Sequence, residues 1–405
     1  MATAAGSLVG FEADGRRTDL DWIRIGAFAL LILYHVGMFY VPNDWDWHVK
    51  SRWSSEPLTL AMYLTNPWRL GLLFLVSGAA TRFMVRRQAP EALARSRTAR
   101  LLPPLAFGML VVVPPQTYLE VVSYAGFTEG FTEFYARYLA GPGFFRDGER
   151  LITPTWNHLW FVTYLWVYTL ALAGLLALSA GLPERLERWA ERRLSGWGVL
   201  LWPVLVFAVM RLTLAPVFEQ THALVDDWYN HGQYLFLFLL GFAIARSERV
   251  WAALDRFRRP AAVLALTAYA AWASYAWAYR GDGVEPAEAL GAVMRVVYAI
   301  DQWAWIAAIL AYGRRWLSGR DGPVRRYLTD AIFPFYIVHQ TAIVVFGYLL
   351  TRSGLPAPAE AALLIGLTAA ACLATHEVVR RVGLLRPLFG LKRAEAPPPL
   401  RPALA

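Results

Sequence analysis

Ten apolar stretches divide this sequence, and each is long enough to cross a lipid bilayer as a helix. A hydrophobic content of 57% and a mean hydropathy of +0.37 agree with a membrane protein. The stretches lie near residues 20–41, 64–85, 101–122, 158–180, 198–217, 231–248, 260–279, 289–312, 329–350 and 359–380. The sequence therefore predicts an all-α integral membrane protein of about ten transmembrane helices within residues 20–393. An N-terminal segment, 1–19, precedes it, and a disordered Ala- and Pro-rich tail, 394–405, follows.

Arginines mark every second connection between these stretches. Segments 82–100, 181–197, 246–259 and 313–328 each carry at least four arginines, whereas segment 218–230 has neither Lys nor Arg. Because basic loops stay in the cytoplasm, this alternation places both termini there and predicts a multi-pass protein of the bacterial cytoplasmic (inner) membrane. The net charge of +9 then reflects topology and lipid contact, so nucleic acid is not an expected partner.

One long connection, 123–157, is expected on the outer side and is rich in aromatic residues. Loops of this length usually have a function. Two interpretations stay open: an interfacial helix anchored by its rings, or a lid or stacking platform for a sugar.

Two polar residues of the first stretch, Arg24 and His35, lie eleven positions apart. Eleven residues make nearly three helical turns, so both side chains share one stripe, about 16 Å apart along the axis. Ionisable residues inside a membrane are expensive and usually functional. The alternative is that Arg24 reaches the phosphate headgroups and that His35 bonds a backbone carbonyl.

The stretch RTDLDWIR at 17–24, which leads to His35, resembles the opening of the acyltransferase-3 family of membrane acyltransferases. Further similar elements are FLVSG at 74–78, RTAR at 97–100 before Pro103, HLWF at 158–161 and YIVH at 336–339. The run EVVRRVGLLRPLF at 377–389 is most similar to the glucan biosynthesis protein C (glucan succinyltransferase) branch of that family.

The resemblance implies an enzyme that transfers an acetyl or succinyl group from cytoplasmic acyl-CoA to a hydroxyl of an extracytoplasmic carbohydrate or glucan. Acyl-CoA is then the donor substrate, and no permanently bound cofactor is expected. Arg24, Arg97 and Arg100 would pair with its phosphates, since guanidinium groups bind phosphate bidentately. His35 would act either as a general base on the acceptor hydroxyl or as a nucleophile that carries the acyl group.

Several other polar and aromatic residues are candidates for an acceptor or acyl pocket. They are Arg69, Trp156, His158, Trp160, Tyr336, His339 and Gln340. Ordinary roles stay open as well, such as an aromatic belt around His158 and polar contacts between helices at His339. Many family members have Ser-Tyr-x-x-Tyr where this chain has AIFPFY at 331–336, and Pro334 is expected to kink or break the helix before His339.

Asp301 is a candidate to orient His35, and it could equally pair with a membrane arginine. Asp21 is a second candidate, although it lies too far along the helix to contact His35 directly. The single cysteine, Cys372, excludes an internal disulfide, and the histidines lack ligand-like spacing with acids, so no metal site is expected.

Two other classes of protein fit the same composition. In a proton-coupled secondary transporter or flippase, His35, Asp301 and Arg69 would form a proton or substrate path. The sequence contains no repeated halves of the kind many transporters have. The third class is a catalytically silent glycan-binding subunit. The oligomeric state stays open.

Arg69, Arg211 and Arg295 lie toward the outer parts of their stretches and suggest recognition of a dicarboxylic acyl group. If Arg69 binds the distal carboxylate of a succinyl group, Arg69→Gln should lower turnover of succinyl-CoA at least about tenfold, because a hydrogen bond to a charged group contributes about 1.5–3 kcal/mol. Turnover of succinyl-CoA and acetyl-CoA by the purified protein checks this. A clear acetyl preference that Arg69→Gln leaves unchanged would contradict it.

Overall fold

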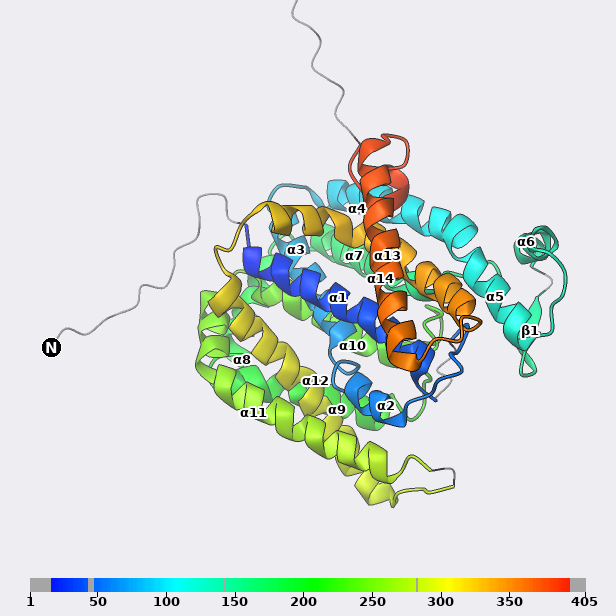
Figure 1. Ribbon diagram of the computed structural model, residues 1–405. Helices are drawn as coiled ribbons and strands as arrows, with labels where there is room; N and C mark the ends of the chain where they lie inside the picture. The colour runs from blue at the N-terminus through cyan, green and yellow to red at the C-terminus, as the bar shows by residue number, and fades with distance from the viewer. Residues whose placement is uncertain (1–15, 43–46, 142, 282, 394–405) are drawn as a thin grey trace, which may run out of the picture.

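Helices occupy all ten predicted stretches in the computed structural model, which describes residues 16–42, 47–141, 143–281 and 283–393 (Figure 1). The helices are α1 (Thr18–Tyr40), α2 (Glu56–Tyr63), α3 (Arg69–Met84), α4 (Pro90–Phe107), α5 (Pro114–Tyr124), α6 (Phe131–Ala140), α7 (Trp160–Leu178), α8 (Leu182–Arg193), α9 (Gly198–Thr213), α10 (Trp228–Ile244), α11 (Glu248–Ala278), α12 (Glu288–Leu317), α13 (Pro323–Leu350) and α14 (Ala357–Arg381). Three short helical turns are η1 (Gly108–Val112), η2 (Asn157–Leu159) and η3 (Pro387–Phe389). Strands β1 (Phe144–Arg146) and β2 (Glu149–Leu151) form one antiparallel hairpin. The predicted tail, 394–405, and most of the N-terminal segment lie outside the described residues.

Among the described residues, seven helices are long and apolar enough to cross a membrane. An eighth span results if α8 and α9, which meet at a bend of 104°, count as one. Two of the predicted spans fall short because α3 has 16 residues and α10 has 17, which is about 25 Å of helix at 1.5 Å per residue. The structure is therefore an all-α multi-pass membrane protein, and helix length alone does not confirm ten crossings.

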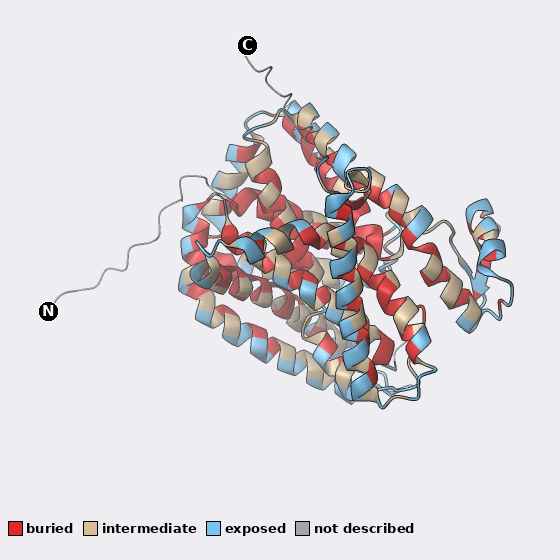
Figure 2. Ribbon diagram, turned by 45° about the horizontal axis from the view of Figure 1, so that its top comes forward, coloured by how far each residue is buried: buried red, intermediate tan, exposed pale blue. Residues whose placement is uncertain are grey.

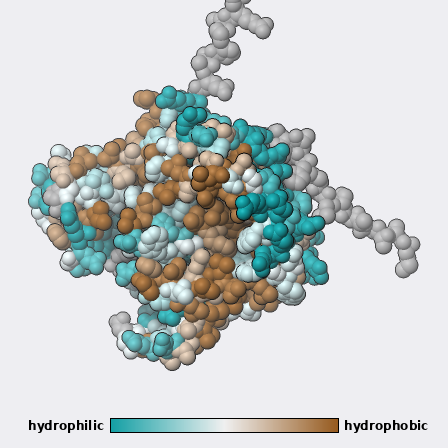
Figure 3. All heavy atoms as spheres, turned by 180° about the vertical axis from the view of Figure 1, so that it is seen from behind, coloured by the Kyte–Doolittle hydropathy of each residue, from teal (hydrophilic) through white to brown (hydrophobic). Residues whose placement is uncertain are grey.

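The membrane-facing surface is apolar. Hydrophobic residues form a broad band across the middle of the face in Figure 3, with hydrophilic residues gathered toward its edges. Only 17% of the apolar window of α11 is buried within the protein, against 56% for its neighbour α12. Figure 2 shows the same contrast between buried central helices and partly exposed outer ones. The exposed apolar side chains of α11 are therefore placed to contact lipid.

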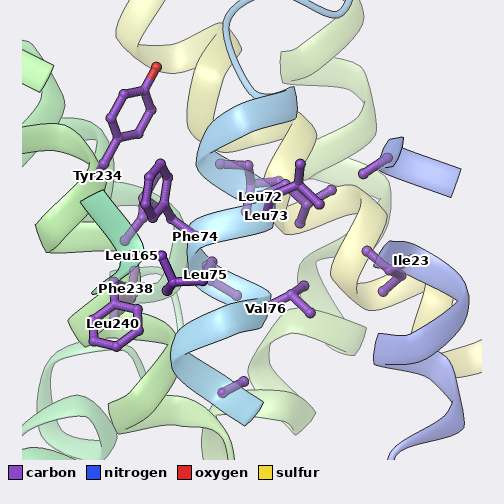
Figure 4. Packing of buried hydrophobic residues seen from close by; sticks show 14 of the residues in the cluster. Ile23, Leu72, Leu73, Phe74, Leu75, Val76, Leu165, Tyr234, Phe238 and Leu240 are labelled. Carbon is purple, nitrogen blue, oxygen red and sulfur yellow. The ribbon is translucent and has the colours of Figure 1, made fainter. Parts of the chain in front are cut away.

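Helices α3 and α10 pack closely against each other through two glycines. A Cβ atom on Gly78 would overlap the backbone carbonyl of Phe238, and a Cβ atom on Gly241 would overlap that of Leu75. Small residues allow such backbone contact between membrane helices. Figure 4 shows Phe74 of α3 directed toward Tyr234, while Val76 faces the side of α1. This pair of helices is thus the packed centre against which α1 lies.

The basic connections meet at one end of the bundle, which we call the basic end. Thr18 Oγ1 donates to the carbonyl of Leu317 at 3.2 Å, and Arg17 donates to that of Ala245 at 3.2 Å. Arg82 is buried there and pairs with Glu187 of α8 at 2.9 Å. The connections at the other end, the opposite end, also contact one another, as in the hydrogen bond from Trp156 Nε1 to the carbonyl of His222.

The long aromatic connection folds into a small core of its own at the opposite end. Its rings pack against one another and against α5; the buried members are Val121, Phe127, Phe134, Tyr138 and Phe144. Burial also raises the pKa of Tyr138 to about 12. Most of these rings are therefore occupied with each other, which disfavours a sugar-stacking platform made from them.

Helix α13 runs unbroken through Pro334, so the predicted break is wrong. Pro334 lacks the N–H that would bond one turn earlier. The remaining helix bonds and the packing of Ile332, Tyr336 and Ile337 in the core keep the segment helical.

Replacing Gly241 by alanine should lower the thermal unfolding midpoint of the detergent-solubilised protein, because the added Cβ forces α3 and α10 apart and overpacking costs about 1–3 kcal/mol. Gly174→Ala in α7 is the matched control. No atom lies within 4 Å of the position that its Cβ would take, and alanine is the better helix former by about 1 kcal/mol. Equal midpoints for the two variants would contradict the packing argument.

Candidate functional site

A large cavity opens at the basic end between α1, α3, α4 and the segment that follows α14. Its volume is about 1410 Å³, above the roughly 300–1,000 Å³ of ordinary small-molecule pockets. We call it the basic cavity because ten cationic side chains and one carboxylate, Asp21, line it. The cations are Arg16, Arg17, Arg24, Arg86, Arg87, Arg97, Arg100, Arg246, Lys392 and Arg393.

The three arginines expected to bind an anionic ligand lie together in this cavity. Arg24 comes from the second turn of α1, and Arg97 and Arg100 come from successive turns of α4. Arg97 is 9% exposed and donates to Thr81 Oγ1 at 3.1 Å, and Arg24 donates to Asp21 at 3.3 Å. The buried Nε atoms of both Arg24 and Arg97 have no partner among the described residues. These groups therefore keep unused donors beside a cavity.

The carboxylate in the cavity lining does not balance the positive charge of the cavity. Asp21 also pairs with Arg16 at 2.9 Å and with Arg325, so its charge is shared. Among the described residues, seven of the ten cations have no ion-pair partner; they are Arg86, Arg87, Arg97, Arg100, Arg246, Lys392 and Arg393. An arrangement of this kind suits a ligand with several negative charges.

Helix α1 joins the cavity to His35. Arg24, Phe28, Leu31 and His35 follow one another at intervals of four, three and four residues, so they form a single stripe. Phe28 and Leu31 are buried, and the ring of Phe28 meets that of Tyr336 edge-on at 5.7 Å. Two apolar side chains therefore separate the cavity from His35 along the stripe.

His35 forms a hydrogen-bonded pair with His339 of α13. The distance from His35 Nδ1 to His339 Nε2 is 2.9 Å. His339 Nδ1 lies 2.8 Å from the carbonyl oxygen of Tyr336, and a carbonyl can only accept, so this nitrogen carries the proton. In a neutral His339, Nε2 must then accept from His35 Nδ1. The Nε2 atom of His35 is thereby left with a free lone pair, which is the form that a base or nucleophile needs.

His158 completes a group of three histidines. Its ring centroid lies 5.2 Å from that of His339, its Nε2 lies 3.0 Å from the carbonyl of Ile337, and Tyr336 Oη donates to its backbone carbonyl. With 6% exposure it is buried beside the pair. Tyr336 and His158 thus brace the turn of α13 that holds His339.

The two tryptophans next to His158 are less available than expected. Trp156 Nε1 bonds the carbonyl of His222 at 3.0 Å. Trp160 is 9% exposed and packs against Phe74, Tyr234 and His222, with 4.2 Å between its centroid and that of His222. In this arrangement the Trp160 ring lies inside the protein core, which argues against the prediction that it lines an acceptor pocket.

A charged group beyond His35 was not predicted from the sequence. Glu120 of α5 contacts His48 Nδ1 at 2.5 Å and Arg146 at 3.1 Å, with about 7% of its side chain exposed. The ring of Trp47 lies between the two histidines, with its centroid 5.5 Å from that of His35 and 5.8 Å from that of His48. Because Glu120 lies within a predicted span, the sequence could have marked it as a functional candidate. Its partners could not be predicted, because they come from distant segments of the chain.

Amide side chains continue this group toward α13. Gln340 Nε2 lies 3.1 Å from both His48 Nε2 and Gln116 Oε1, and Asn157 Nδ2 lies 3.3 Å from Gln116 Oε1. Gln116 in turn donates to Thr341 at 2.6 Å. Gln340 thus belongs to a buried polar network one residue after His339, on the side toward the opposite end.

The intramembrane arginines have aromatic partners. Arg69 is 2% exposed, lies 3.7 Å above the ring of Tyr34 and donates to Thr65 at 3.1 Å. Arg211 donates to Tyr229 at 2.7 Å and lies 3.6 Å above the ring of Tyr298. No carboxylate pairs with either arginine among the described residues, so cation–π contacts help to hold these charges.

Neither aspartate considered as an orienter of His35 bonds to it. Asp21 lies fourteen residues earlier in α1 and pairs with arginines at the basic end. Asp301 of α12 is fully buried beside Trp305 of the same helix, and no hydrogen bond between described residues links it to His35. His339 orients His35 instead, because α13 packs along α1 at this level.

Comparison with known proteins covers nearly the whole bundle. The profile of the Acyl_transf_3 family, described as an acyltransferase domain, matches residues 17–377. The chain is similar to glucans biosynthesis protein C of Escherichia coli strain K12, of Escherichia coli O81 and of Shigella dysenteriae serotype 1. Each is 23% identical over 353 residues, covering 83% of this chain and 84% of the relative. No solved structure matches the chain.

Glu120→Gln should destabilise the protein strongly, because it removes the carboxylate that compensates a buried arginine. Breaking such a pair costs about 3–5 kcal/mol. The loss should be visible as a lower unfolding midpoint in detergent. Glu133→Gln, on the exposed face of α6, removes the same charge nearby and should leave the midpoint unchanged. If both variants unfold like the wild type, the group around Glu120 is not a buried ion pair.

Proposed function

Because the chain belongs to the acyltransferase-3 family and is an acyltransferase, we propose that it carries an acyl group across the membrane. It takes the group from acyl-CoA bound in the basic cavity and delivers it to a carbohydrate hydroxyl at the opposite end, with His35 at the point of transfer. The observation that carries this proposal is the α1 stripe. It joins a cavity in which most cations have no ion-pair partner among the described residues to an imidazole whose Nε2 is free.

The charge and the length of acyl-CoA match the basic cavity and the α1 stripe. Coenzyme A carries its negative charges at one end of a long thin arm and its thioester at the other. Arg24, Arg97 and Arg100 hold phosphate oxygens, with unpartnered Nε atoms on Arg24 and Arg97 as additional donors. The arm then follows the α1 stripe over the roughly 16 Å to His35. On this path it passes Phe28, whose ring lies against that of Tyr336.

His35 supports two routes of transfer. In the direct route, its Nε2 takes the proton of the acceptor hydroxyl while that oxygen bonds the acyl carbon. The C–S bond breaks, and the proton passes to the departing CoA thiolate. In the covalent route, Nε2 itself bonds the acyl carbon while the C–S bond breaks and CoA leaves as the thiolate. The acceptor oxygen then bonds the acyl carbon, the bond from that carbon to Nε2 breaks, and the hydroxyl proton passes to Nε2 and on to the thiolate. In both routes His35 becomes cationic, and its Nδ1–H bond to His339 stabilises that charge.

The topology that this transfer needs is ten crossings with both termini in the cytoplasm. The described chain begins and ends at the basic cavity, since Arg16 and Arg17 line it together with Lys392 and Arg393. The basic connections contact one another at that end. By the positive-inside rule, this end faces the cytoplasm of a bacterial cytoplasmic membrane.

The acceptor enters from the opposite end. The polar network of Gln340, Gln116, Asn157 and His48 offers amide and imidazole groups beyond the histidine pair. Such groups suit sugar hydroxyls, and the relatives are named for glucan biosynthesis. We propose a glucan or related carbohydrate as the acceptor, and acetyl or succinyl as the acyl group, with Arg69 as the residue that would favour succinyl.

Purified protein incubated with radiolabelled acyl-CoA and glucan should label the glucan, and His35→Ala should reduce the rate at least about 100-fold, the lower range for loss of a general base. His376→Ala in α14 is the matched control. That histidine is also buried in a membrane helix, and its Nδ1 has no partner among the described residues.

Three outcomes discriminate between the mechanisms. Normal transfer by a folded His35→Ala protein would overturn the role of His35. Label that stays on the wild-type protein when glucan is omitted, and is absent from His35→Ala, would select the covalent route. Label on neither protein, together with transfer by the wild type, would select the direct route.

A further inference from the structure

Four exposed cations form the outer edge of the basic cavity, which we call the cavity rim. Arg86 and Arg87 come from the turn between α3 and α4, and Lys392 and Arg393 come from the segment after α14. None of the four has an ion-pair partner among the described residues. By contrast, Arg97 is buried deeper in the same cavity. The cavity therefore has an inner and an outer set of cations.

The segment after α14 is built into the fold. Gly390 adopts a φ of +70°, and a Cβ atom there would overlap the ring of Phe333. Phe389 is buried with its ring 5.3 Å from that of Phe107 of α4. Arg386 Nε donates to the carbonyl of Lys392 at 2.7 Å. Figure 1 shows this turn beside α4, so Lys392 and Arg393 are held at the cavity by packing.

This segment lies outside the part of the chain that the family profile matches. The match ends at residue 377, near the end of α14, whereas the rim residues are 392 and 393. The family match therefore does not account for the part of the cavity wall that Lys392 and Arg393 form.

We propose that Lys392 and Arg393, with Arg86 and Arg87, bind the phosphomonoester at the nucleotide end of the CoA donor; this rests on the proposed function. The order of the chemical groups along the CoA donor determines where its 3′-phosphate lies. Its thioester must reach His35, its diphosphate then meets the inner arginines, and the ribose with its 3′-phosphate is left at the rim. A phosphomonoester carries nearly two charges at neutral pH, which four uncompensated cations complement.

The phosphate of an anionic lipid headgroup has the same chemistry and could also reach an exposed rim. We favour the donor because Lys392 and Arg393 line the cavity itself together with Arg24 and Arg97. The two sources are separated by measuring in bilayers with and without anionic lipid.

The test uses full-length protein in nanodiscs of phosphatidylcholine, with acyl-CoA and acyl-dephospho-CoA as paired donors. For the wild type, KM should be lower for acyl-CoA. In the Lys392→Gln/Arg393→Gln variant, KM for acyl-CoA should rise about fivefold or more, about 1 kcal/mol at 1.4 kcal/mol per tenfold, with kcat unchanged. KM for acyl-dephospho-CoA should not change. Binding of adenosine 3′,5′-bisphosphate should weaken by a similar factor.

Arg256→Gln/Arg259→Gln is the matched control. It removes two exposed charges of α11 in the basic connection 246–259, outside the cavity, and should leave both KM values unchanged. An unchanged KM in the rim variant, or an equal rise for both donors, would overturn the proposal. So would an effect seen only with anionic phosphatidylglycerol in the bilayer, which would assign the rim to lipid headgroups. If the wild type turns over no acyl-CoA, the proposed function fails, while bisphosphate binding still tests the rim.

Discussion

Hydrocarbon offers no hydrogen-bond partners, and this constraint organises the interior of the protein. Buried polar side chains that are to be satisfied must therefore find their partners within the protein. His35 finds His339, which in turn reaches the carbonyl of Tyr336. Glu120 finds His48 and Arg146, and Arg69 finds the face of Tyr34. These bonds set the relative positions of α1, α5 and α13, and so they set the geometry of the site.

The tautomers of the histidine pair follow from the same constraint. The carbonyl of Tyr336 can only accept, so His339 donates to it through Nδ1 and accepts from His35 Nδ1 through Nε2. The free lone pair is then at Nε2 of His35. A further hydrogen bond holds this series of bonds in place, since the hydroxyl of Tyr336 donates to the backbone carbonyl of His158. A single helix, α1, then links this imidazole to the basic cavity.

The contrast between the two ends of the bundle gives the molecule its direction. At the basic end, most cavity cations lack a carboxylate partner among the described residues, and the cavity is left for an anionic ligand. Toward the opposite end, Glu120 is paired with Arg146, and the groups beside this pair are amides and imidazoles. A phosphate-rich donor and an uncharged hydroxyl acceptor are matched to these different environments.

The membrane class, the positions of the ten helical stretches, the shared stripe of Arg24 and His35, and the family could all be predicted from the sequence. These depend on local hydrophobicity, helical periodicity and motif order, which are readable along one chain. It missed His48, Gln116 and Asn157, and it proposed aspartates where His339 is the partner of His35. Those contacts depend on the three-dimensional fold, because they join residues from 41 to more than 300 positions apart. Which helix faces which is set by packing such as that of Gly78 and Gly241.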